Sequence, residues 1–170
     1  MDSEIEGRQA GMQQPPLTEL MHWEDVPVGE TRAFGRITVS RDEIVAFARA
    51  FDPQPVHVDE EAAKASMIGQ LFASGWHSCA MMMRMLADDI LNGFASLGSP
   101  GLEDCRWMKP LFPGDVLSGR YTCVAKRVLK SRPGVGICQM EYAMINQAGD
   151  IVMTWKAAQL MRVRNAGDAP

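Results

Sequence analysis

The sequence contains no long apolar run and no excess of basic residues. No stretch approaches the roughly 20 consecutive apolar residues that a membrane-spanning helix needs. Lys and Arg total 17 against 21 Asp and Glu, which gives a formal net charge of -4. A nucleic-acid-binding protein usually presents a basic face, and this balance argues against one. We therefore expect neither nucleic acid nor a membrane among the partners of the chain.

The four cysteines are scattered, and no two of them form a C-x-x-C motif. Their spacing favours neither a zinc ribbon nor a redox motif, and we predict no metal site. Residues 1–6 are acidic and lack the apolar core of a secretory signal. Free thiols without such a signal favour a reducing compartment, so we expect a cytoplasmic protein.

The length and composition are those of one globular domain. The chain has 170 residues, of which 46% are hydrophobic and 22% charged. A chain of this length can bury a core and enclose a pocket. Residues 1–20 carry few large apolar side chains, so we predict a mobile tail there, and a frayed end over 165–170. The predicted domain spans residues 21–164.

The apolar periodicity predicts helices followed by a series of long strands. Ser40 and Glu43 form a capping box before a helix that ends at Phe51. The most apolar helix shows little polar face, so we expect it to be buried. The predicted fold is α+β, with one antiparallel sheet wrapped around this long central helix. The expected elements are strands over 31–39, 102–111, 115–129, 136–146 and 151–163, and helices over 41–51, 60–66 and 76–91.

Asp52 and His57 are the first candidates for chemistry. They lie five positions apart in the segment Asp52-Pro53-Gln54-Pro55-Val56-His57. We expect residues 52–58 to form a loop stiffened by the two prolines. Acid–base catalysis suits such a pair, because histidine titrates near neutrality and a nearby carboxylate can be tuned. The alternative is that Asp52 caps a turn and His57 only packs.

Ser74 and Gly75 open the central helix and form the second candidate. The first-turn N–H groups of a helix have no intrahelical acceptor and carry partial positive charge. Gly75 lets a ligand approach the backbone, so this end can stabilise an oxyanion. The alternative is simple N-capping by Ser74, and both roles can hold together.

Taken together, these segments resemble the MaoC-like dehydratase family, which includes the (R)-specific enoyl-CoA hydratases of hotdog fold. The family's Asp-x-x-x-x-His motif stands here at residues 52–57, followed by Asp59, and its small residue and Gly stand at Ala73-Ser74-Gly75. Further similar segments are Trp23–Gly29 and Lys109–Asp115. The resemblance covers residues 23–163 and implies a single hotdog domain.

The resemblance implies a hydratase or dehydratase of a 2-enoyl or 3-hydroxyacyl thioester. Asp52 and His57 would hold and activate a water that adds to the β-carbon, while Gly75 N–H would bond the thioester oxygen. Coenzyme A is then part of the substrate, and no metal or redox cofactor is needed. The family also implies a homodimer or a dimer of dimers, with sheets joined side by side. The residues expected to bind substrate are Pro55, Val56, Ser74, Trp76, Met82 and Met83.

Two other functions stay open. One is a hotdog thioesterase, which often uses a carboxylate on the central helix, where this chain has no Asp or Glu before Asp88. The other is a non-catalytic module that binds acyl thioesters. The chain also departs from the family in having Gln54 in place of an Asn, Ser74 where some members have His, and apolar residues over 81–83 where some have a polar one.

Two groups of residues bear on substrate choice. Methionine is abundant at 13 residues, and five lie on or beside the central helix. They either fill the core or line an adaptable acyl pocket; they are Met67, Met81, Met82, Met83 and Met85. Basic side chains on the late strands either meet the phosphates of coenzyme A or form a solvated face; they are Arg106, Lys109, Lys126, Arg127, Lys130 and Arg132.

Overall fold

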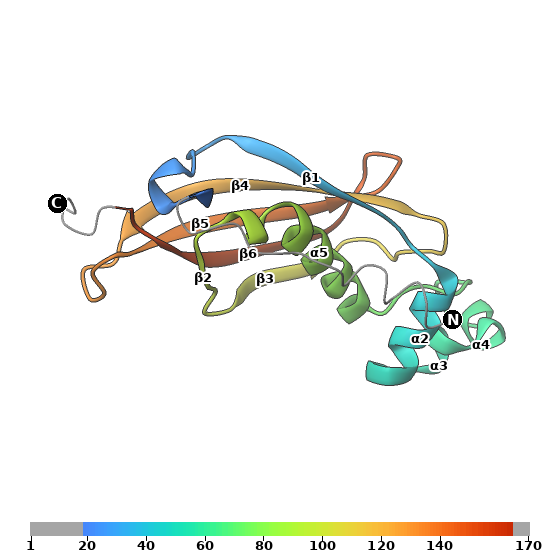
Figure 1. Cartoon of the computed structure of the whole chain (residues 1–170). Helices are drawn as coiled ribbons and strands as arrows, with labels where there is room; N and C mark the ends of the chain where they lie inside the picture. The colour runs from blue at the N-terminus through green and yellow to red at the C-terminus, as the bar shows by residue number, and fades with distance from the viewer. Residues whose placement is uncertain (1–18, 165–170) are drawn as a thin grey trace.

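The computed structural model describes residues 19–164. One antiparallel sheet curves around the long helix α5, as predicted (Figure 1). The predictions for 1–18 and 165–170 lie outside the described residues, whereas Leu20, predicted in the tail, is buried. The strands are β1 (Thr31–Thr38), β2 (Ser96–Gly98), β3 (Leu102–Trp107), β4 (Val116–Val128), β5 (Val135–Ile145) and β6 (Ile151–Arg162). The helices are η2 (Trp23–Asp25), α2 (Arg41–Phe51), α3 (Pro55–Val58), α4 (Glu60–Lys64), α5 (Gly75–Asp89) and η3 (Leu91–Gly93).

The strand order is β1-β4-β5-β6-β2, and β3 also pairs with β6. The last three strands form the predicted antiparallel meander, with Tyr121 opposite Tyr142 and Tyr142 opposite Trp155. The short strand β2 was not predicted, because three residues are too few to show an alternating pattern. Strand β3 ends at Trp107, four residues before the predicted end. Between them, β2 and β3 form one edge of the sheet.

Helices α2, α3 and α4 gather at one end of the sheet, beside the first turn of α5 (Figure 1). Ser40 caps α2, and its side chain accepts from Glu43 N–H, as the capping motif predicts. Residues 52–58 were expected to be a loop throughout, and the structure corrects this. Pro55 occupies the first position of α3, where its missing N–H costs nothing, so a single helical turn forms over Pro55–Val58.

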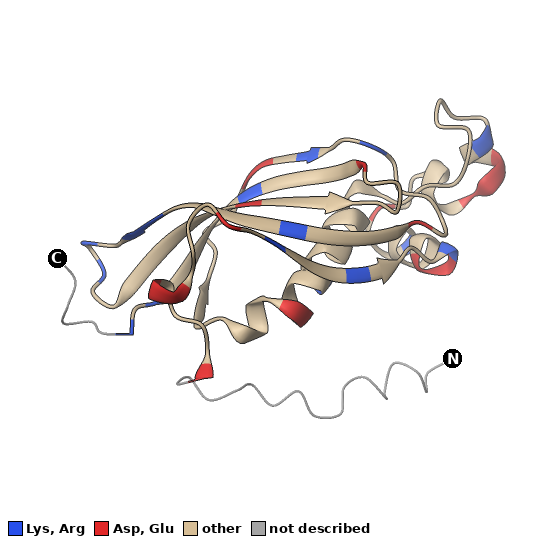
Figure 2. Ribbon diagram, turned by 90° about the horizontal axis from the view of Figure 1, so that it is seen from above, with Lys and Arg blue, Asp and Glu red and all other residues tan. Residues whose placement is uncertain are grey.

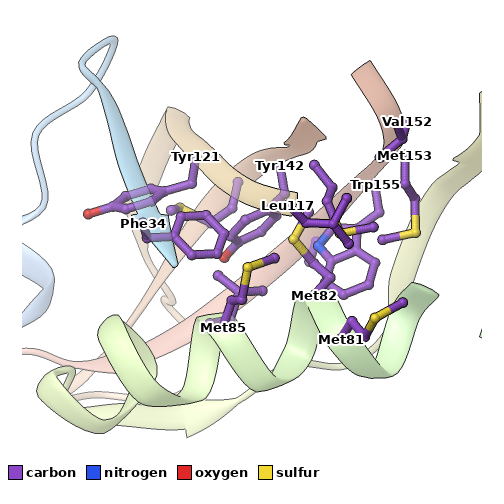
Figure 3. Packing of buried hydrophobic residues seen from close by; sticks show 14 of the residues in the cluster. Phe34, Met81, Met82, Met85, Leu117, Tyr121, Tyr142, Val152, Met153 and Trp155 are labelled. Atoms are coloured by element: carbon purple, nitrogen blue, oxygen red, sulfur yellow. The ribbon is translucent and has the colours of Figure 1, made fainter. Parts of the chain in front are cut away.

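The core lies between α5 and the concave face of the sheet (Figure 3). Met82 and Met85 point from α5 toward Leu117 and Tyr142, and all four side chains are buried (Figure 3). Flexible thioether side chains suit the uneven gap between a curved sheet and a helix. The helix is not buried on every side, however, since Trp76 is 62% exposed.

Glycine at position 35 lets β1 close over the helix. Gly35 has φ +68°, and a Cβ at that position would lie 2.6 Å from the Met85 side chain. The register with β4 shifts between Phe34 and Ile37, as in a β-bulge. Residues with a Cβ rarely adopt this backbone conformation, so a side chain there would be strained as well as crowded. The bend brings β1 against α5 at the end of the core away from α3.

Basic and acidic residues are interspersed along the strands (Figure 2). Lys156 on β6 and Glu141 on β5, for example, are opposite each other and form an ion pair of 3.1 Å. Within residues 19–164, no helix is long and apolar enough to cross a membrane.

Candidate active site

The junction of α2 and α3 brings the predicted carboxylate and imidazole together. Asp52 ends α2 in a non-helical conformation, with φ -151° and ψ 67°. The chain then passes Pro53 and enters α3, whose single turn places His57 beside the carboxylate. The distance from Asp52 Oδ2 to His57 Nε2 is 3.7 Å. This is slightly too long for a direct hydrogen bond, so the two groups face each other across a narrow gap.

Two polar side chains orient the carboxylate of Asp52. The Ser74 hydroxyl donates to Asp52 Oδ2 at 2.6 Å, and the Gln54 amide donates to Oδ1 at 2.7 Å. Both bonds favour the ionised form. They lower the pKa of Asp52 below its ordinary value of 3.8, with Ser74 making the larger contribution and burial opposing it. Asp52 is therefore a fixed carboxylate at neutral pH.

The backbone carbonyl of Phe72 fixes the ring of His57. His57 Nδ1 lies 3.0 Å from Phe72 O, and since a carbonyl only accepts, Nδ1 carries a hydrogen and donates. In the neutral ring, Nε2 is then an acceptor, and it faces Asp52. The ring also packs edge-on against the Phe72 side chain at 4.7 Å and is only 6% exposed. Two hydrogen-bond acceptors, Asp52 Oδ2 and His57 Nε2, therefore face each other 3.7 Å apart.

The N-terminus of α5 meets this pair through Ser74. The same hydroxyl that donates to Asp52 caps the helix by accepting from Trp76 N–H at 3.2 Å. Gly75 follows as the first residue of α5, and its N–H finds no acceptor among residues 19–164. The predicted capping role and the proximity to the catalytic candidates thus hold together. The helix start presents partial positive charge beside the Asp52–His57 pair.

Trp107, on β3, covers Gly75. Its indole N–H donates to Gly75 O at 2.8 Å, and a Cβ on Gly75 would lie 2.7 Å from the Trp107 ring. The sequence predicted that a glycine here lets a ligand approach the backbone. The structure adds a second reason for glycine at this position, because the indole fills the space that a side chain would take. Trp76 packs against the same ring in a T-shaped pair at 5.7 Å between centroids.

A cavity of about 380 Å³ opens over these groups. Asp52 and His57 lie in its wall together with Gly75, which the sequence predicted as the three catalytic residues. Most of the other walls are apolar and come from α5, the segment before it and the segment after β3. The remaining lining residues are Gln54, Ile68, Phe72, Ala73, Trp76, Ser78, Trp107, Met108, Lys109, Pro110 and Leu111.

Of the residues expected to bind substrate, Trp76 alone lines this cavity. Ser74 is fully buried behind the wall, where it bonds Asp52. Pro55 and Val56 form α3 but do not line the cavity. Met82 lies in the core and Met83 is 44% exposed, so the structure does not place the helix methionines in the wall.

The methionine that lines the cavity is instead Met108, just after β3. The apolar residues Phe72 and Leu111 also line the cavity. Leu111 lies in the segment Lys109–Asp115, which carries the family resemblance, whereas no motif includes Phe72. Ala73 N–H donates to Leu111 O at 2.8 Å, so backbone pairing brings these two wall segments together. Residues of this kind carry no chemistry that a sequence motif could reveal.

The basic side chains do not form one group. Lys109 lines the cavity and pairs with Asp150 at 2.8 Å. Lys126 instead donates to the carbonyls of Trp23, Glu24 and Val26, so it ties η2 to β4. The β4–β5 turn, near Arg127, Lys130 and Arg132, lies at the opposite end of the sheet from α2–α4 (Figure 1). No group of three His, Cys, Asp or Glu in the described part of the chain could hold a metal ion.

Ser74→Ala tests the link between the helix cap and Asp52. Losing the cap costs about 1 kcal/mol of folding stability, and losing the hydroxyl donor raises the pKa of Asp52 toward 3.8. A carboxylate whose pKa is lower in the folded state than in the unfolded state stabilises the fold at pH values above its unfolded-state pKa. This stabilisation is lost as the pH falls through the folded-state pKa. We therefore expect urea denaturation to show a larger loss of stability at neutral pH than well below pH 3.8.

Ser40→Ala is the matched control for this prediction. Ser40 caps α2 in the same way but has no bond to Asp52. Its loss is expected to cost a similar cap energy with little dependence on pH. Equal pH dependence in the two variants would show that Ser74 does not tune the carboxylate.

Comparison with known proteins places this geometry among related domains. The family model described as MaoC like domain matches residues 25–141 of this chain. A MaoC-like dehydratase from Rhodospirillum rubrum is 37% identical, with a TM-score of 0.78 over 85% of this chain and 99% of that one. The uncharacterized protein YdeM of Bacillus subtilis is 29% identical over 115 residues, which cover 68% of this chain and 82% of YdeM.

More distant structures show the same fold. The unliganded R-hydratase PhaJ1 of Pseudomonas aeruginosa is 22% identical, with a TM-score of 0.66 over 85% of this chain and 86% of PhaJ1. A Mycobacterium tuberculosis protein described as a double hotdog fold is 16% identical, with a TM-score of 0.72 over 90% of this chain and 47% of that one. The antiparallel sheet around α5 is thus a hotdog fold, as predicted.

Proposed function

Because the chain belongs to the MaoC-like domain family, we propose that it adds water to a 2-enoyl thioester, or removes water from a 3-hydroxyacyl thioester. The observation that carries this proposal is the pair of acceptors, Asp52 Oδ2 and His57 Nε2, 3.7 Å apart in the cavity wall. The similarity to a MaoC-like dehydratase from Rhodospirillum rubrum supports the same class of reaction.

A single water can satisfy both acceptors. Hydrogen bonds to oxygen and nitrogen are about 2.8 Å long, so one water oxygen can reach both atoms across a 3.7 Å gap. Such a water donates one hydrogen to each group and leaves a lone pair free to attack the β-carbon. As the bond forms, one acceptor takes a proton from the water. That group then delivers the proton to the α-carbon, which regenerates the acceptor and completes the addition without any change of oxidation state.

The start of α5 supplies the complementary charge. Addition of water to the β-carbon moves negative charge onto the thioester oxygen, and a preorganised donor lowers the energy of that state. We propose Gly75 N–H as this donor, since it lines the cavity without an acceptor among the described residues. Trp107 keeps it in position by holding Gly75 O. One such donor is worth about 3–4 kcal/mol in the transition state.

The substrate we propose is a thioester of coenzyme A. Coenzyme A is then part of the substrate, and the proposed reaction uses no further cofactor. The acyl group would lie against the apolar wall formed by Ile68, Phe72 and Leu111. These apolar side chains would contribute binding energy through contact with an apolar acyl group. The first experiment is therefore to incubate the purified protein with a panel of trans-2-enoyl-CoA thioesters and record the loss of enoyl absorbance.

A thioesterase would use the same fold but attack the carbonyl carbon. On α5, the acidic residues Asp88 and Asp89 lie in the last turn, where they bond Arg84 and Gly35 N–H. They do not line the cavity. A thiol-reactive dye separates the two reactions, because hydrolysis releases free coenzyme A and hydration does not. Thiol release at the rate of absorbance loss would overturn the proposal.

We also propose that two copies pair along the β2–β3 edge. This edge has no strand partner within residues 19–164, and it exposes Leu97, Leu102, Trp107 and Met108. Exposed apolar side chains on an open edge favour association with another strand. Since Trp107 and Met108 also line the cavity, such a dimer would bring each cavity near the interface.

Light scattering after gel filtration tests this pairing. We expect a mass near twice 18.7 kDa for the natural chain, and about the single mass for Leu102→Glu. Arg36→Glu, an exposed position on the opposite edge strand β1, should leave the dimer intact. A monomer at micromolar concentration in the natural chain would exclude the proposed dimer.

A further inference from the structure

Two cysteine thiols are in contact beside the cavity. Cys79 on α5 and Cys105 on β3 are 26 residues apart, yet their sulfur atoms are 3.9 Å apart. Both are free and half-buried. The Cys79 sulfur also contacts Met153 Sδ at 3.9 Å. Neither thiol takes part in the proposed hydration.

The backbone around Cys105 is irregular. The pairing of β3 with β6 changes register between Glu103 and Arg106, and Asp104 has φ +51°. A bulge of this kind interrupts the regular ladder, so the intervening residue is less constrained than one in a central strand. A disulfide has a sulfur–sulfur distance of about 2.05 Å, which requires the two sulfurs to approach by about 1.9 Å. A strand whose pairing with β6 is interrupted beside the cysteine can accommodate that movement.

The other two thiols provide an internal contrast. Cys123 and Cys138 lie on the central strands β4 and β5 and are fully buried, at 0% exposure. A small oxidant cannot reach them without opening the core. Partial exposure therefore distinguishes Cys79 and Cys105 from the two buried thiols.

We propose that Cys79 and Cys105 form a dithiol that a low-molecular-weight disulfide oxidises to an intramolecular disulfide, which joins α5 to β3. With glutathione disulfide, one cysteine thiolate attacks a glutathione sulfur and releases one glutathione. The second cysteine thiolate then attacks the protein sulfur of the mixed disulfide, forms the Sγ–Sγ bond and releases the other glutathione. The two cysteines lose two electrons, which reduce glutathione disulfide to two thiols. Those thiols also take up the two protons.

The environment of Cys79 indicates the order of these steps. Burial raises the pKa of the Cys79 thiol to about 12, and the neighbouring Cys105 thiol adds to the shift. Since the thiolate is the attacking species, we expect Cys105 to form the mixed disulfide and Cys79 to close the ring slowly.

The proposed disulfide would act on the contact that holds Gly75. Cys79 lies one helical turn after Gly75, and Cys105 lies two residues before Trp107 on β3. The Trp107–Gly75 hydrogen bond therefore joins the same two elements as the disulfide. Drawing β3 toward α5 changes the position of the indole over the cavity. We expect oxidation to reduce hydration activity reversibly, and this activity effect rests on the proposed function, whereas formation of the disulfide does not.

Redox titration of the full-length protein tests the dithiol. After equilibration with mixtures of glutathione and glutathione disulfide and alkylation of free thiols, we expect mass spectrometry to find a peptide linking Cys79 to Cys105. The link should be absent in Cys79→Ala and in Cys105→Ser, and present in the control Cys138→Ala. Oxidation should raise the thermal unfolding midpoint of the natural chain, and dithiothreitol should reverse the shift.

Each outcome separates this proposal from the hydratase proposal. If both cysteines remain free, or carry separate glutathione adducts, the dithiol proposal is wrong whatever the activity. A Cys123–Cys138 link in place of the expected one would also overturn it. If the Cys79–Cys105 link forms but no enoyl thioester is hydrated, the dithiol stands and the proposed reaction fails.

Discussion

Asp52→Asn and His57→Gln are each expected to lower the rate of enoyl-CoA hydration by about 10²–10⁴-fold. Asn cannot act as a base, and it replaces one of the two acceptors that face each other at 3.7 Å. Gln removes the imidazole that Phe72 O holds in its donor–acceptor orientation. The measurement is the initial rate of absorbance loss with purified variants whose circular dichroism and unfolding midpoint match those of the natural chain.

Asp59→Asn provides the control for charge removal near the site. Asp59 caps α4 by accepting from Ala62 N–H and does not line the cavity. Asn caps helices about as well as Asp, so this variant should fold and retain the natural rate. If a folded Asp52→Asn enzyme kept the rate of Asp59→Asn, the catalytic role of Asp52 would be wrong.

Gly75→Ala is expected to reduce the rate by about 10²-fold, the lower end of the cost of losing an oxyanion donor. The new Cβ would lie 2.7 Å from the Trp107 ring, so the indole must move. Because Trp107 is 48% exposed within one chain and lies outside the core, its displacement leaves the fold intact. The displaced indole no longer holds Gly75 O, and the N–H donor loses its fixed position. Gly101→Ala, with open space around its Cβ, is the matched control.

A double-mutant cycle separates the contact between the new Cβ at position 75 and the Trp107 ring from other effects of Gly75→Ala. In a Trp107→Ala background, the Cβ has no ring to meet, so Gly75→Ala should have a much smaller effect than in the natural chain. Residues in contact show such non-additivity, whereas independent ones do not. Strictly additive losses of rate would show that the indole contact does not position the donor.

Sequence periodicity predicted the sheet and its central helix because both depend on local patterns. The strands over 116–128, 135–145 and 151–162 and helix α5 begin and end within two residues of the expected positions. Asp52, His57 and Gly75 could be selected together because the family resemblance links their two segments, and the structure places all three around one cavity. Their roles in chemistry stay predictions.

The remainder of the site depends on contacts between distant segments. Trp107 reaches Gly75 across 32 positions, and its role could not be read from either residue alone. Ser74 was expected to cap a helix, and its bond to Asp52 depends on how α2 and α5 pack. The helix methionines were ambiguous because burial and pocket lining both favour apolar side chains. In the structure, Met82 lies in the core, and the methionine that lines the cavity is Met108, just after β3.

The most direct test of the central claim is the fate of the oxygen of water. The protein is incubated with a short trans-2-enoyl-CoA in water enriched in oxygen-18, and the thioester products are identified by mass spectrometry. We predict an intact coenzyme A thioester that carries one labelled hydroxyl at the β-carbon. Label in a released carboxylic acid, together with free coenzyme A, would instead show attack on the carbonyl carbon and contradict the hydratase proposal.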